Sequence, residues 1–121
     1  MKALAVAQGY FDAWNQQNAD GIIAAFAEDG TYSDPTVGQG VSREATANYA
    51  RGLWDAFPDL TFEIISNVET GPDTVVAQWS MRGTNTGSLR GLPPTGRAVA
   101  VPGADFIQVE GDKIRSVAGL F

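Results

Sequence analysis

The sequence predicts an α+β fold, with helices in the first half of the chain and antiparallel strands in the second. Before Pro58 apolar residues recur mainly at helical spacing, and after it they alternate with polar residues. Segregation of the two patterns along one chain is typical of α+β domains. The 121 residues show no linker, repeat or low-complexity tract, so we expect residues 1–121 to form one domain. Three helices packed on a curved antiparallel sheet should enclose a pocket.

Three amphipathic stretches predict the helices. The first, at about residues 2–17, carries its apolar residues on one stripe. The second, at 21–27, follows an expected N-cap at Asp20. The third begins at an N-cap, Ser42, and continues to residue 57, where Pro58 stops it.

The strands follow from turn residues and from alternation. A short strand is expected at residues 31–34, after a turn at 28–30 and before a loop at 36–40. Pro102-Gly103 predicts a bulge or bend within a later strand. Four longer antiparallel strands are expected, at about residues 60–70, 75–86, 97–110 and 113–121.

Composition excludes several classes of function. The net charge of −6 argues against nucleic acid, because no basic surface is available for phosphates. The chain has no cysteine and no histidine, which excludes disulfides, thiol nucleophiles and Ser-His-Asp triads and disfavours zinc, copper and iron sites. We therefore expect no metal and no cofactor. No membrane-length apolar run or signal peptide is apparent, so a cytoplasmic protein without membrane contact is expected.

Asp105 is the most unusual residue of the chain, because it lies in an otherwise apolar strand. A buried carboxyl group needs a hydrogen-bonding partner or a proton. Asp105 is therefore either a structural residue, hydrogen-bonded to a partner, or a catalytic acid. Tyr10 lies on the apolar stripe of the first helix, where packing in the core is the usual role. Asp34 precedes Pro35 and either initiates a turn or places a carboxylate at a pocket mouth.

A pocket between the helices and the sheet would suit a flat, mostly apolar ligand with several rings. Four polar residues could converge on it: Tyr10, Asp34, Asn85 and Asp105. Two carboxyl groups in one apolar site can have pKa values pushed apart, so that one is a base and the other a donor. Together with a tyrosine they suffice to remove a proton next to a carbonyl group. The expected apolar lining is Trp14, Phe26, Trp54, Phe57, Trp79, Met81 and Ile107.

Several motifs resemble the SnoaL-like polyketide cyclases of the NTF2-like superfamily, which has a cystatin-like α+β cone. They are Phe57-Pro58-Asp59-Leu60, Trp79 with Gly83-Thr84-Asn85-Thr86-Gly87, Gly91-Leu92-Pro93-Pro94-Thr95-Gly96-Arg97, Gly103-Ala104-Asp105 and Gly111-Asp112-Lys113-Ile114. The resemblance implies that Asp105 is the acid/base of an intramolecular aldol closure, on an aromatic polyketide methyl ester and without a cofactor. Asn85 stands where those cyclases carry a histidine. An asparagine can orient a carbonyl group or bond to Asp105, but it cannot exchange a proton.

A second resemblance, to ketosteroid isomerase of the same superfamily, involves Tyr10, Asp34 and Asp105. It implies the roles of oxyanion donor, general base and protonated acid for these three residues, respectively.

The leading hypothesis is thus a small-molecule enzyme of proton transfer at carbon, a cyclase (lyase) or an isomerase. Asp34 or Asp105 would be its base, while Tyr10 and Asn85 would hold the substrate oxygen. The alternative is a non-catalytic ligand-binding or dimerisation module in which Asp105 is structural. Epoxide hydrolysis is a third hypothesis, although none of the arginines has a spacing that assigns it to Asp105. The family resemblance also implies a homodimer formed through the outer face of the sheet.

Overall fold

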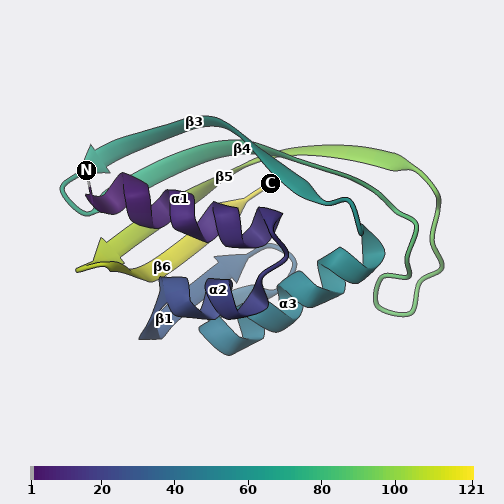
Figure 1. Ribbon diagram of the computed structural model, residues 1–121, viewed down its shortest axis with the longest axis horizontal. Coiled ribbons are helices and arrows are strands. Elements are labelled where there is room, and N and C mark those ends of the chain that lie inside the picture. Colours follow the sequence, from purple (N-terminus) through teal and green to yellow (C-terminus); the bar gives the residue numbers. More distant parts are fainter. Residues whose placement is uncertain (1) are drawn as a thin grey trace.

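Within residues 2–121, which the computed structural model describes, the chain forms three helices and one six-stranded sheet (Figure 1). The sheet is curved and unclosed, and it arches over α1, with α2 and α3 on the same side (Figure 1). The predicted α+β class is therefore confirmed. The elements are α1 (Lys2–Asn15), α2 (Ala19–Ala25), β1 (Phe26–Asp34), β2 (Gly38–Ser42), α3 (Arg43–Ala56), β3 (Thr61–Gly71), β4 (Thr74–Thr84), β5 (Ala98–Glu110) and β6 (Lys113–Leu120).

The strand order brings the two halves of the chain together. Across the sheet the order is β2-β1-β6-β5-β4-β3, and β1 runs parallel to the last strand, β6. All other neighbours are antiparallel. Ser33 of β1 pairs with Ala118 of β6, and Gly119 of β6 pairs with Asp105 of β5. This register places the end of β1 close to Asp105, about seventy positions later in the sequence.

Helix starts follow the N-cap rule, with one correction. Ser42 is the N-cap of α3, as predicted, and its hydroxyl accepts a hydrogen bond of 3.1 Å from the amide of Ala45. For α2 the predicted cap, Asp20, is wrong. Asn18 has the extended backbone of an N-cap and accepts a bond of 3.0 Å from the amide of Gly21, so the helix starts earlier and also ends earlier.

Two strand predictions are corrected at the sheet edge. Residues 26–30, expected to be helix and turn, belong to β1, and residues 38–42, expected to be loop and cap, form β2. Tyr32 of β1 pairs with Val41 of β2. β2 is mostly exposed and has no alternating burial. Its sequence therefore shows no alternation of apolar and polar residues from which a strand could be predicted.

Of the bulge or bend predicted at Pro102-Gly103, the bulge is wrong. Residues 98–108 of β5 pair with β4 in continuous register, with Gly103 opposite Trp79. A Cβ atom on Gly103 would collide with the indole ring of Trp79 and would lie 2.8 Å from the carbonyl oxygen of Leu120. The glycine therefore makes room for a large ring without interrupting the ladder.

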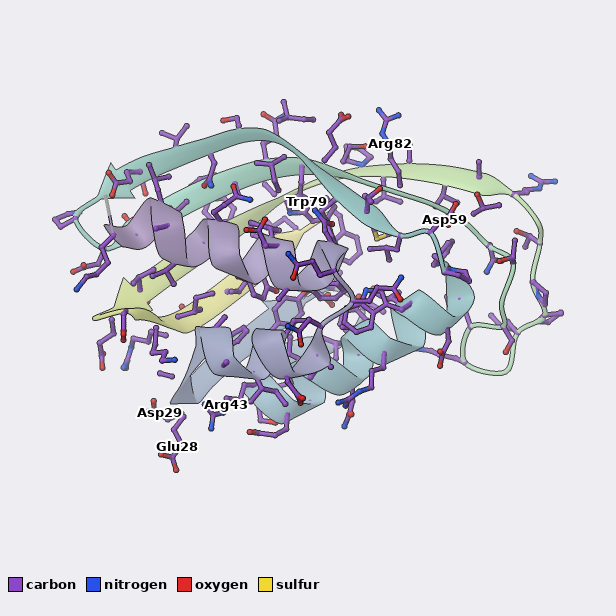
Figure 2. All side chains as sticks on the ribbon, viewed as in Figure 1. Glu28, Asp29, Arg43, Asp59, Trp79 and Arg82 are labelled. Atoms are coloured by element: carbon purple, nitrogen blue, oxygen red, sulfur yellow. The ribbon has the colours of Figure 1, made fainter. Side chains whose placement is uncertain are left out.

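Aromatic side chains fill the space between α1 and the sheet. Trp79 lies on the inner side of β4, whereas Arg82 points away from the helices (Figure 2). Phe62 of β3 packs edge-on against Trp79, with ring centroids 5.0 Å apart, and against Trp14 of α1 at 5.3 Å. None of the helices in residues 2–121 combines the length and the apolarity that crossing a bilayer requires.

Candidate functional site

A cavity of about 780 Å³ lies between the helices and the inner face of the sheet. Its wall is mostly aromatic and aliphatic, which suits an apolar ligand. The predicted lining residues Trp14, Phe57, Trp79 and Met81 contribute to it. The polar side chains that reach the cavity are Tyr10, Tyr32, Thr36, Asn48, Tyr49, Arg90 and Asp105.

Asp105 is the buried acid of this cavity. It is only 4% exposed, and its strand neighbours are the small residues Ala77 and Gly119. Burial raises the pKa of Asp105 to about 7, the indole of Trp79 opposes this rise, and the charge of Asp34 adds to it. The indole N–H itself completes no hydrogen bond among residues 2–121, so its influence is that of a nearby dipole. Asp105 can therefore both release and accept a proton near neutral pH.

Tyr10 lies on the same cavity, 1% exposed. Its ring packs edge-on against Phe11 at 5.3 Å and against Phe26 at 5.6 Å. Burial, followed by the negative charge of Asp105, raises the pKa of Tyr10 well above its ordinary value. The hydroxyl group consequently stays protonated and can donate a hydrogen bond within the cavity.

Asp34 does not line the cavity, and its carboxylate is already hydrogen-bonded within the protein. Its Oδ1 accepts hydrogen bonds from the amides of Thr36 (2.8 Å) and Val37 (2.7 Å), which is the turn-forming arrangement considered from the sequence. Its Oδ2 accepts a bond of 2.6 Å from the hydroxyl group of Tyr32. With both oxygens bonded, Asp34 is poorly placed to act as a base.

Tyr32 connects Asp34 to the cavity. A Cβ atom on Gly119 would lie 3.0 Å from Asp105 Oδ1, 3.5 Å from the Tyr32 hydroxyl and 3.5 Å from Asp34 Cβ. The three polar side chains thus converge around one glycine. Tyr32 was missed in the sequence, although it lies two positions before Asp34 and strand alternation places both on one face.

Asn85 is a structural residue and not a pocket residue, which corrects the sequence-based prediction. Its amide nitrogen donates to the carbonyl oxygens of Ala56 (3.2 Å) and Gly87 (2.9 Å). Its amide oxygen accepts from the backbone amide (2.9 Å) and the hydroxyl group (3.1 Å) of Thr95. These four bonds hold the ends of the loop between β4 and β5 and leave no group for a ligand.

Three predicted lining residues are in the core. Phe26 and Ile107 are fully packed, at 0% and 1% exposure, and neither borders the cavity. Trp54 packs edge-on against Trp14 at 5.9 Å. For Trp54 the physical reason is the orientation of α3, whose cavity-facing stripe is Ala45, Asn48, Tyr49, Gly52 and Leu53. The adjacent stripe, Thr46, Ala47, Ala50 and Trp54, is buried.

The loop between β4 and β5 also reaches the cavity, through Leu89, Arg90 and Leu92. The sequence assigned no role to Arg90. Tyr49 of α3 also lines the cavity. Its pKa is raised by burial and by Asp34 and lowered by Arg90. Among residues 2–121, no three carboxylates lie close enough together to hold a metal ion.

The sequence profile of the SnoaL-like domain family matches residues 7–117. The chain therefore belongs to this family, as the motifs predicted. No curated protein is significantly similar to it in sequence.

Solved structures are similar in fold. IdmH from Streptomyces antibioticus, provisionally assigned as a polyketide cyclase, is 24% identical, with a TM-score of 0.83 over 95% of this chain and 88% of its own. A provisionally assigned SnoaL-like polyketide cyclase from Jannaschia sp. CCS1 is 20% identical, with a TM-score of 0.85 over 98% and 83%. An uncharacterised cystatin-fold protein from Novosphingobium aromaticivorans is 20% identical, with a TM-score of 0.79 over 100% and 99%. At these identities the likeness establishes the fold, and the chemistry must be argued from the site.

Proposed function

We propose that this protein is an enzyme that moves a proton at carbon, without a cofactor, in an apolar polycyclic ketone or polyketide. The observation that carries the proposal is Asp105, a 4% exposed carboxyl group with a pKa of about 7 in the wall of an aromatic cavity. An acid with a pKa near the working pH is suited to both halves of a proton transfer. Membership of the SnoaL-like domain family supports the same chemistry.

In the proposed reaction, ionised Asp105 removes a proton from the carbon next to a substrate carbonyl group. Tyr10 donates a hydrogen bond to the carbonyl oxygen, where negative charge develops as the C–H bond breaks. In an isomerisation Asp105 then returns the proton to a different carbon of the same enolate. In an aldol closure the enolate carbon attacks a second carbonyl group, whose oxygen takes the proton from Asp105. The proton is conserved in both cases, and no metal or redox step is needed.

Of the four candidate catalytic residues that the sequence predicted, we propose that only Asp105 and Tyr10 take part in the reaction. Asp34 is proposed to position Tyr32 and to raise the pKa of Asp105, because its own oxygens are both bonded. Asn85 is left out of the reaction, since its amide is saturated by the loop. Asp105 is thus the proposed base, and Tyr10 is the proposed oxygen donor.

We further propose that the protein forms a homodimer through the outer face of its sheet. Val68, Val76, Phe106 and Ala118 are paired in register across four strands on that face. Val68 and Phe106 are 52% and 47% exposed, so this row leaves apolar surface that a second copy could cover.

The test is turnover of a panel of polycyclic ketones and aromatic polyketide methyl esters by the wild type and by Asp105→Asn, Tyr10→Phe and Asp112→Asn. Asp112 lies in the exposed turn after β5 and controls for the loss of one acid. We expect Asp105→Asn to lose turnover by at least about a hundredfold, Tyr10→Phe to lose less, and Asp112→Asn to match the wild type. Ligand binding without turnover by the wild type would support the non-catalytic binding module instead. Full activity of Asp105→Asn would exclude the proposed base.

A further inference from the structure

The tip of the loop between β4 and β5 is a two-residue hairpin with an unfavourable residue in it. The amide of Leu89 donates to the carbonyl of Leu92 at 3.1 Å, and the reverse bond is 2.8 Å. Arg90 and Gly91 between them have φ angles of 50° and 78°. Such turns favour asparagine, aspartate or glycine at both positions. The turn itself therefore does not explain why an arginine occupies the first one.

Within the described part of the chain, the guanidinium group of Arg90 has no ion-pair partner. Arg90 is exposed and borders the cavity beside Leu89 and Leu92. It takes part in none of the ion pairs found among residues 2–121, which involve Arg43, Arg82 and Arg115. A cation is thus held at the mouth of an apolar cavity, in a protein whose net charge is −6.

The polar groups of the cavity are therefore divided by depth. Tyr10 and Asp105 are buried, whereas Arg90 is exposed to solvent. Aromatic and aliphatic side chains line the wall between them. A ligand complementary to this arrangement has a carbonyl group on an apolar ring body at its inner end and an anionic group at its outer end. The planar guanidinium group matches a carboxylate in particular, since it can donate two parallel hydrogen bonds.

We propose that Arg90 is a specificity-determining residue that binds a free carboxylate of the ligand. The substrate class is then an aromatic or polycyclic ketone acid, rather than the corresponding neutral ester. This inference rests on the proposed function for the inner end of the ligand, but it concerns binding and not proton transfer. It can therefore be tested separately from turnover.

The test compares naphthalene-2-carboxylate with methyl 2-naphthoate, which differ in charge and share the same rings. Dissociation constants are measured by calorimetry at pH 6, where the aryl carboxylate is ionised and Asp105, with a pKa of about 7, is mostly neutral. The proteins are the wild type, Arg90→Gln, Arg90→Lys and Arg97→Gln. Arg97 lies at the end of the same loop, directly before β5, is exposed and does not border the cavity, so it is the matched control for net charge.

We expect the wild type to prefer the carboxylate and Arg90→Gln to lose that preference by roughly tenfold, the effect of one charge-assisted interaction at an exposed site. Arg90→Lys should retain part of the preference, and Arg97→Gln all of it. Equal effects of Arg90→Gln and Arg97→Gln, or an unchanged carboxylate-to-ester ratio in Arg90→Gln, would overturn the role of Arg90 and leave the proposed function standing. If neither probe binds the wild type, the apolar ligand site fails, and this inference fails with it.

Discussion

Replacing Asp105 with asparagine should stabilise the protein above neutral pH while abolishing its proposed chemistry. The change keeps the shape of the side chain and removes the charge. Burial raises the pKa of Asp105 from its ordinary value of 3.8 to about 7. At about 1.36 kcal/mol per pKa unit, this corresponds to roughly 4 kcal/mol of destabilisation when the folded protein holds the ionised form.

The pH dependence of the stability gained by Asp105→Asn follows from the raised pKa of Asp105. The folded-state pKa lies above the unfolded value, so the native state holds the proton more tightly. Below pH 4 both states are protonated and the burial of charge has no effect. The stability of the wild type then falls as the pH rises from about 4 to about 7, and it stays reduced above that range. The stability gained by Asp105→Asn should increase over the same interval and then level off.

Urea unfolding followed by tryptophan fluorescence measures this gain at pH 4, 5.5, 7 and 9. Asp59→Asn is a control of opposite sign, because hydrogen bonds from the amide (2.7 Å) and hydroxyl group (2.8 Å) of Thr84 lower the pKa of Asp59. Asp59→Asn should lose stability by the same amount at pH 5.5, 7 and 9, because a deficit caused by a lowered pKa shrinks only below about pH 4. A gain for Asp105→Asn that does not change with pH, or a loss at pH 9, would refute the assignment of Asp105 as a desolvated acid.

Three further predictions concern the site, the loop between β4 and β5 and the outer face of the sheet, and Gly9→Ala is the control for the first. Gly119→Ala brings a Cβ atom to 3.0 Å from Asp105 Oδ1, so we expect turnover to fall and stability to drop by about 1–2 kcal/mol. Gly9→Ala, which meets nothing within 4 Å, should leave turnover unchanged and raise the melting temperature. Asn85→Ala removes four hydrogen bonds and should lower the free energy of unfolding by about 2–3 kcal/mol in denaturant titrations; a neutral effect would contradict its structural role. Phe106→Glu should convert a dimer into a monomer in sedimentation experiments, and a wild type that is already monomeric would remove the dimer proposal.

The sequence determined the fold class and the elements with strong periodicity. The change from helical spacing to alternation at Pro58 gave the order of helices and long strands, because side-chain burial in each of them follows its own period. Ser42 was correctly predicted as a cap because a cap is a local interaction. The motifs of the second half also pointed to the SnoaL-like family, which the match over residues 7–117 confirms.

Only the tertiary structure decided which polar side chains share the site. Whether Asn85 faces a ligand or the loop depends on Ala56 and Thr95, which are distant in sequence. Strand alternation could have placed Tyr32 beside Asp34, but its proximity to Asp105 requires the parallel pairing of β1 with β6. The choice between adjacent stripes of α3 depends on how the helix is rotated against its neighbours, which composition does not fix.

An acid in an apolar strand was visible in the sequence, and with it the question of how its burial is tolerated. The answer depends on Ala77 and Gly119 beside Asp105, on the charge of Asp34 and on the cavity in front of the carboxyl group. These features come from three different strands and from the helices that cover them. Desolvation is a property of the assembled surroundings, so the sequence could identify Asp105 as exceptional, while the pKa of about 7 that makes it suitable for proton transfer arises only in the folded protein.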